Sequence, residues 1–308
     1  MTHVFLAIAP LFLIIFVTAG LQRWRHVGER WSGVLNEFAL KIGLPVLIFS
    51  ALARSQFSFF DQAGVIALNS LFALFLFGGT LGFCKLVRLK AEATRTIVAC
   101  LMFGNIAYLG IPILTQVYDA SILPTVSVII AIWFFWFFTL VTGFVTASRQ
   151  KKNDDGAFRK TCYALVNNPL LVAVVLGLLF AGLSIPIPGI IMQALDMVSA
   201  SVTPTVLIVI GLFIGKSSFG TTKDWIPAVL LSVLTLIILP TAMVAGLQLF
   251  GIDPKTYAVS IIEVAMPLAI TPFALADEYG LNKAWISRSI VLSTILSVFT
   301  LPFWISIL

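Results

Sequence analysis

The sequence predicts an all-α integral membrane protein with ten transmembrane helices, arranged as two five-helix repeats of inverted topology. Only 10% of the 308 residues are charged, 60% are hydrophobic and the mean hydropathy is +1.07, whereas a soluble domain carries roughly 25% charged residues. Apolar runs long enough for a hydrocarbon core of about 30 Å recur along the whole chain. They lie at 4–22, 34–54, 63–87, 93–117, 122–147, 163–183, 191–214, 225–250, 256–277 and 285–307.

Basic residues set the orientation of these ten segments. Of the 19 Lys and Arg residues, all but Lys41, Arg54 and Lys255 fall in the gaps that follow segments 1, 3, 5, 7 and 9. By the positive-inside rule these gaps face the cytoplasm, so both termini are expected on the extracytoplasmic side. The first apolar run, from Val4 to Gly20, has no basic residues before it and is expected to remain as a span rather than to be a signal peptide.

The two halves of the chain share a weak internal repeat. Pro112 and Pro272 are separated by the same offset as Val46-Leu47-Ile48 and Val206-Leu207-Ile208, and so long a period indicates a duplicated half rather than a solenoid. We therefore expect one repeat over 1–147, a polar cytoplasmic linker over 148–160 and a second repeat over 161–308. Five helices per repeat force the second repeat to enter the membrane from the opposite side.

Prolines interrupt one helix in each half. The ninth segment contains Pro267 and Pro272, and the fourth contains Pro112. Each proline removes a backbone donor and clashes with the carbonyl four residues before it, which costs about 3 kcal/mol or more inside a helix. Broken backbone survives in a membrane only where it is buried in protein or lines a water-filled cavity. Interrupted segments at matching positions in two inverted halves are typical of secondary transporters.

Other classes of function find little support. The basic residues lie in short gaps between apolar runs, which is the pattern of topology signals and not of nucleic-acid binding. The cysteines, Cys84, Cys100 and Cys162, are scattered without disulfide or metal-ligand spacing. His3 and His26 lie outside the apolar segments. We expect no catalytic residues, no metal and no cofactor, and hence not an enzyme.

Several motifs resemble the auxin efflux carrier family. The specific ones are residues 266–279, which include Met266-Pro267-Leu268 and Thr271-Pro272-Phe273, and residues 105–114, which end Gly-Ile-Pro-Ile-Leu. The likeness continues in residues 35–47, in Asn168-Pro169 and in Gly211-Leu212-Phe213, so it spans nearly the whole chain.

The resemblance implies an architecture and a site. Helices 1, 2, 6 and 7 would form a scaffold, helices 3–5 and 8–10 a moving transport unit, and the protein would be a homodimer. Helices 4 and 9 would cross at their prolines, with a small organic anion bound beside the crossing. Carried to this chain, the resemblance nominates Asn105, Pro112 and Pro272 as substrate-binding residues. We add Tyr108, Gly110 and Thr271, which lie in the same two proline motifs, as further candidates for substrate binding.

Two departures bear on the substrate. The long cytosolic loop of the plant carriers is absent, and no charged pair lies around Ala67-Leu68-Asn69-Ser70, where those carriers have one. The chain therefore resembles a bacterial member placed in the inner membrane. Malonate, malate or an auxin-like acid is the expected substrate, moved by an elevator-type shift of the transport unit. A sodium-coupled symporter similar to the bile-acid carriers is the alternative, although the segments around the crossing are largely aliphatic.

Two charged residues within the segments are further candidates. Glu263 lies in the ninth segment, and an ionisable group at membrane depth is a functional hypothesis by default. We expect it to bind a proton during transport, unless it pairs with a cation or reaches the outer interface. Lys41 follows Glu37 by four residues, which favours a pair on one helix face. Lys41 is also a candidate for attracting the anion.

A dense aromatic run covers residues 133–138 in the fifth segment. Aromatic side chains supply large apolar area, so we expect a packing or lipid-facing surface here rather than a ligand site.

Overall fold

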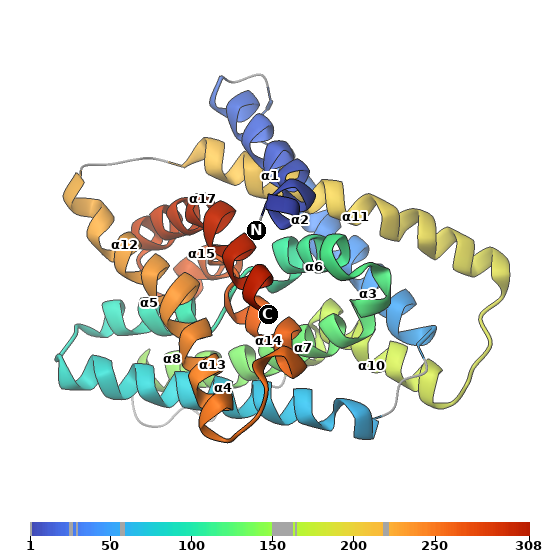
Figure 1. The fold of residues 1–308 in the computed structure, drawn as a ribbon. Helices are drawn as coiled ribbons and strands as arrows, with labels where there is room; N and C mark the ends of the chain where they lie inside the picture. Colours follow the sequence, from blue (N-terminus) through green and yellow to red (C-terminus); the bar gives the residue numbers. More distant parts are fainter. Residues whose placement is uncertain are drawn as a thin grey trace.

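The computed structural model describes residues 2–24, 27, 28, 30–55, 59–149, 163, 165–217 and 222–308. This part of the chain is helical (Figure 1), and its only β-pairing is one isolated bridge. Seven helical segments are long and apolar enough to cross a membrane: His3–Arg23, Trp31–Ala53, Gln62–Leu86, Ala120–Val145, Gly189–Lys216, Ile226–Leu249 and Lys283–Ile307. Ile106–Tyr118 and Pro169–Gly182 are shorter apolar helices. The prediction of an all-α integral membrane protein is confirmed.

Wide π-helical turns let three helical segments continue past a proline. They are Ala39–Gly43 (η1) before Pro45, Ile106–Gly110 (η2) before Pro112, and Leu234–Ile238 (η6) before Pro240. A π turn widens the helix where the proline ring would strike the carbonyl four residues back. In the third case that carbonyl belongs to Leu236, and it accepts a hydrogen bond from Trp304 Nε1 at 2.8 Å. The freed acceptor is thus satisfied inside the protein, as a membrane interior requires.

One group of helices packs around a long pair. α1 (Thr2–Arg23) lies against α11 (Gly189–Lys216), and α3 (Leu44–Ala53) packs between α11 and α10 (Pro169–Gly182). Figure 1 shows α1 crossing α11 at the edge of the molecule. α2 (Trp31–Phe38) also contacts α11.

Small residues bring α1 and α11 together. A methyl group added at Gly211 would collide with the carbonyl oxygen of Ile15, and one at Gly215 would collide with that of Ala19. Such close backbone approach through glycines four apart is a common way for membrane helices to associate. The two helices are therefore tightly packed.

A second group carries the remaining spans. α4 (Phe59–Leu86) packs on α7 (Leu123–Trp136), which continues through η4 (Phe137–Val141) into α8 (Thr142–Arg149). α12 (Ile226–Val233), which continues through η6 into α13 (Leu239–Leu249), packs on α17 (Lys283–Ile307). The remaining helices are α5 (Ala91–Leu101), α6 (Ile111–Tyr118), α14 (Ala258–Val264), α15 (Thr271–Ala274) and α16 (Ala276–Tyr279). Figure 1 shows α14 near the middle of the molecule.

A buried polar contact fixes three helices of this second group to one another. Asn69 on α4 is fully buried; its Nδ2 donates to Ser260 Oγ on α14 at 2.8 Å, and its Oδ1 accepts from Trp133 Nε1 on α7 at 3.1 Å. Buried polar groups that are satisfied in this way hold one arrangement of the helices. The expected linker over 148–160 lies outside the described residues except for Ser148 and Arg149.

Candidate functional site

Two interrupted helices meet near the middle of the molecule. α5 ends at Leu101 and α14 ends at Val264, and Gly104 pairs with Leu268 in an antiparallel bridge. The Asn105 N–H donates to the Pro267 carbonyl at 2.7 Å, and the Ala269 N–H donates to the Phe103 carbonyl at 3.3 Å. Each break therefore satisfies backbone groups of the other.

The second break is also held by α17. The N–H of Leu268 donates to the hydroxyl oxygen of Ser293 at 3.1 Å, and both residues are fully buried. This contact fixes the crossing against the last span of the chain.

The contact between the two breaks lies at Gly104 and Leu268. The crossing therefore lies next to Pro267, one of the prolines of the ninth segment, and not at Pro112 or Pro272. Pro112 is the second residue of α6 and Pro272 the second residue of α15. The first turn of a helix has no partner for its N–H groups, so Pro272 costs little there. Pro112 follows the η2 turn without a break and is accommodated by that wider turn. Both prolines are buried.

A cavity of about 170 Å³ lies beside the crossing. Four polar side chains line it, those of Asn36, Asn105, Tyr108 and Thr271, and so do Leu40, Phe103, Gly104, Ala107, Phe134, Phe138, Ala269, Ile270, Ala274 and Leu275. None of these residues carries a formal charge. The cavity is apolar with a few polar groups, which is the usual composition of a small-molecule site.

Asn105 contributes an unsatisfied donor to this cavity. Its residue is only 3% exposed, and its Nδ2 has no hydrogen-bond partner among the described residues. An unpaired buried amide costs roughly 1–3 kcal/mol. A ligand oxygen in the cavity would recover that cost, so a carboxylate is a suitable partner for this group.

Tyr108 spans the cavity from the η2 turn to α2. Its hydroxyl donates to Asn36 Oδ1 at 2.8 Å. This hydrogen bond joins the helices at the crossing to the group built around α1 and α11.

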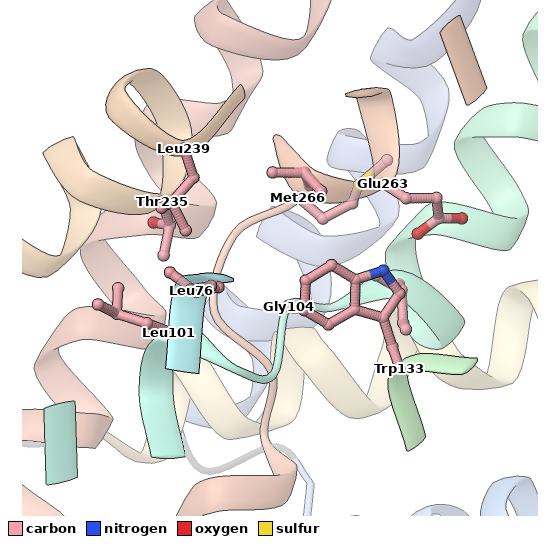
Figure 2. A pocket seen from close by; sticks show the side chains of 10 residues that line it. Leu76, Leu101, Gly104, Trp133, Thr235, Leu239, Glu263 and Met266 are labelled. Carbon is pink, nitrogen blue, oxygen red and sulfur yellow. The ribbon is translucent and has the colours of Figure 1, made fainter. Parts of the chain in front are cut away.

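Glu263 lies in the α14 segment that leads into the second break. It is fully buried, and neither carboxyl oxygen has a hydrogen-bond partner among the described residues. Among the described residues Glu263 therefore has no cation partner, and its side chain does not reach the protein surface. Glu263 lines a cavity of about 20 Å³ with Thr235 and Trp133. Figure 2 shows its carboxyl group turned away from Thr235.

Gly110 provides the space for this carboxyl group. A methyl group at position 110 would lie 2.7 Å from Oε2 and 2.8 Å from Oε1 of Glu263. Any side chain there would displace the acid. Gly110 therefore leaves room for the carboxyl group of Glu263, and it does not line the larger cavity.

Lys41 lies apart from both cavities. Its ammonium pairs with Glu37 at 2.6 Å, and both side chains are about two-thirds exposed, so the predicted pair is present. The described part of the chain contains no group of three or more His, Cys, Asp or Glu residues that could hold a metal ion.

Sequence reasoning missed part of the cavity wall. Phe134 and Phe138 line the cavity, although we expected the aromatic run to form only a packing or lipid-facing surface. Asn36 was also missed as a site residue. A signal existed for Asn36, because it lies in the motif over residues 35–47 that carries the family resemblance.

Comparison with known proteins gives a consistent result. The profile of a family described as membrane transport protein matches residues 3–305. The chain is 26% identical to an uncharacterised transporter of Methanothermobacter thermautotrophicus, covering 98% of this chain and 97% of that one. It is 24% identical to a putative malonate transporter of Rhizobium meliloti, over 95% of this chain and 92% of that protein. It is 22% identical to auxin efflux carrier component 8 of Arabidopsis thaliana, over 96% of this chain and 95% of that protein.

Proposed function

The chain belongs to the auxin efflux carrier family of membrane transport proteins, and on this basis we propose that it is a secondary transporter of a small organic anion. The observation that carries the proposal is the unpaired, buried Nδ2 of Asn105 in the wall of the cavity at the crossing. A carboxylate oxygen would pair with this donor, and the aromatic side chains would contact the rest of the molecule.

The size of the cavity favours a compact acid. At about 170 Å³ the cavity is smaller than the roughly 300–1,000 Å³ of pockets for drug-sized ligands. Malonate and malate are compact acids, whereas a bicyclic auxin-like acid is larger. The similarity to a putative malonate transporter is consistent with the smaller substrates.

We propose an elevator-type mechanism between the two groups of helices. The tight α1–α11 pair with α2, α3 and α10 would form the scaffold, and the helices held together by Asn69 would move with the crossing as one unit. The Tyr108–Asn36 hydrogen bond joins the two groups and would have to break in each cycle. The two halves, 1–147 and 161–308, would be inverted repeats around the crossing.

Proton coupling through Glu263 completes the proposal. A carboxylate that is fully buried without a partner is costly, so the acid would be neutral in this arrangement and ionise when the crossing reaches water. The sodium-coupled alternative needs several oxygen ligands around the ion. The segments around Glu263 are mostly apolar, and its carboxyl group points away from the Thr235 hydroxyl.

Thermal-shift measurements with acetate, malonate, malate and indole-3-acetate on the purified protein test the substrate proposal, because a ligand that binds the folded form raises the Tm. We expect malonate or malate to raise the Tm of the parent and of Asn167→Ala, an exposed-amide control, but not of Asn105→Ala. Equal shifts in both variants would reject the role of Asn105. No shift with any acid in the parent would reject the substrate class.

A further inference from the structure

A second and larger cavity lies on the outside of the helices, away from the crossing. It measures about 690 Å³ and lies between α4 and α13, which cross one another in Figure 1. Phe72, Met243 and Leu247 form its buried floor, while Leu71 and Phe75 on its wall are 67% and 69% exposed. Exposed apolar walls in a membrane-spanning chain face lipid, so this groove opens to the hydrocarbon.

The length of the groove matches one leaflet of a bilayer. Along α4 it extends from Gly64 to Phe75, which is about 16 Å at 1.5 Å per residue. Half of a hydrocarbon core is about 15 Å thick. The groove begins near the start of α4 and ends near its middle, so it follows the depth that one acyl chain occupies.

Polar groups without partners stand at one end of the groove. The hydroxyl of Tyr257 lies against Gly64, where any side chain would collide with it, and it makes no hydrogen bond with the described protein groups. Lys255, two residues earlier, is exposed, and its ammonium forms no ion pair in the described part of the chain. A phenol at the mouth of an apolar groove, with a cation two residues away along the chain, suits a phosphate above a hydrocarbon chain.

We propose that this groove binds a phospholipid. One acyl chain lies between α4 and α13, and the phosphate contacts Lys255 and the Tyr257 hydroxyl. Because Lys255 supplies an unpaired positive charge, the groove prefers a lipid with net negative charge, such as phosphatidylglycerol, to phosphatidylcholine. Tyr257 directly precedes α14, which carries Glu263, so the bound lipid lies next to the helix that leads into the crossing.

Gly246 offers a substitution that fills the groove. It lines the cavity, and a Cβ placed on it meets no atom within 4 Å. A side chain at position 246 therefore begins in open space, and Gly246→Phe places its ring in the lipid space. Gly182→Phe is the matched control, since position 182 on α10 is equally open and lies outside the groove. Native mass spectrometry of protein in detergent with added phosphatidylglycerol counts the bound lipids.

We expect the parent and Gly182→Phe to retain one more phosphatidylglycerol molecule than Gly246→Phe, with the same oligomeric state in all three. Equal lipid counts in the three proteins would overturn the proposal. Loss of a dimer in Gly246→Phe alone would overturn it in favour of a second copy of the chain in the groove.

Lys255→Gln tests the headgroup contact without touching the packing, because this side chain is exposed. We expect the preference for phosphatidylglycerol over phosphatidylcholine, seen as the ratio of the two bound lipids, to fall to about one in this variant. An unchanged preference would overturn the headgroup assignment, and this result holds even if Gly246→Phe fails to fold.

Discussion

Replacing Glu263 with glutamine separates a proton carrier from a structural acid. Glutamine has nearly the same size as the protonated side chain and carries no charge. Since Glu263 has no cation partner among the described residues, nothing is stranded by the change. We therefore expect the free energy of unfolding to change by less than about 1.5 kcal/mol, as for other volume-conserving replacements.

A structural ion pair would give a different result. Breaking a buried pair by removing one partner costs roughly 3–5 kcal/mol. At about 2–4 °C of Tm per kcal/mol, that loss would lower the Tm by about 6 °C or more. The melting temperature of the purified protein thus distinguishes the two roles before any transport is measured.

Transport into liposomes then tests the coupling. In the parent protein, we expect a proton gradient to drive accumulation of the substrate and exchange between the two sides to vary with pH. Glu263→Gln should keep exchange, lose accumulation driven by protons, and become insensitive to pH. Glu278→Gln, at an exposed acid in α16, is the control and should behave as the parent. A stable Glu263→Gln protein with the parent's pH profile would refute the proton-carrier role.

Three further predictions address packing and topology. Gly211→Ala places a methyl group against the Ile15 carbonyl and should lower the free energy of unfolding by about 1–3 kcal/mol. The control Gly78→Ala places its methyl group in open space and should keep or raise the Tm. Equal Tm values for the two variants would contradict close α1–α11 packing. Trp304→Phe removes the donor to a carbonyl freed by a proline and should cost about 1–3 kcal/mol, and a parental Tm would show that another donor replaces it. A single cysteine at Asn153 should resist impermeant reagent added outside sealed cells, and labelling from outside would reverse the predicted orientation.

The general nature of the fold could be predicted from the sequence because composition decides it. Few charges and repeated apolar runs of spanning length indicate membrane helices, because a helix satisfies all of its backbone N–H and C=O groups within one segment in hydrocarbon. The proline motifs identified the family. They also nominated Asn105, Tyr108 and Thr271, which line one cavity.

The position of the crossing could not be predicted in the same way. Whether a proline breaks a helix depends on what satisfies the carbonyl it frees. At Pro240 that partner is Trp304, far along the chain, and Pro112 is accommodated by the π turn before it. Sequence patterns contain no record of such distant partners. The prolines of the ninth segment predicted its break correctly, around Pro267, but Pro112 does not mark the first break, which lies at residues 102–105.

The sequence also could not predict which face of each helix lines a cavity. In α7 nearly every residue is apolar, so periodicity gives no indication of which side faces a cavity, and Phe134 was assigned to packing. The fit of Glu263 into the space left by Gly110 joins two halves of the chain. A pattern within either half does not reveal it.

The mutual pairing of the two breaks has a consequence for how the protein is made. The Asn105 N–H and the Phe103 carbonyl find their partners at Pro267 and Ala269, which leave the ribosome much later. Until then the first break has unsatisfied backbone at membrane depth, where each such group costs several kcal/mol. Until the second half of the chain is synthesised, water, neighbouring helices or the insertion machinery must therefore satisfy or shield these backbone groups. The first half completes its folding only when it packs against the second half.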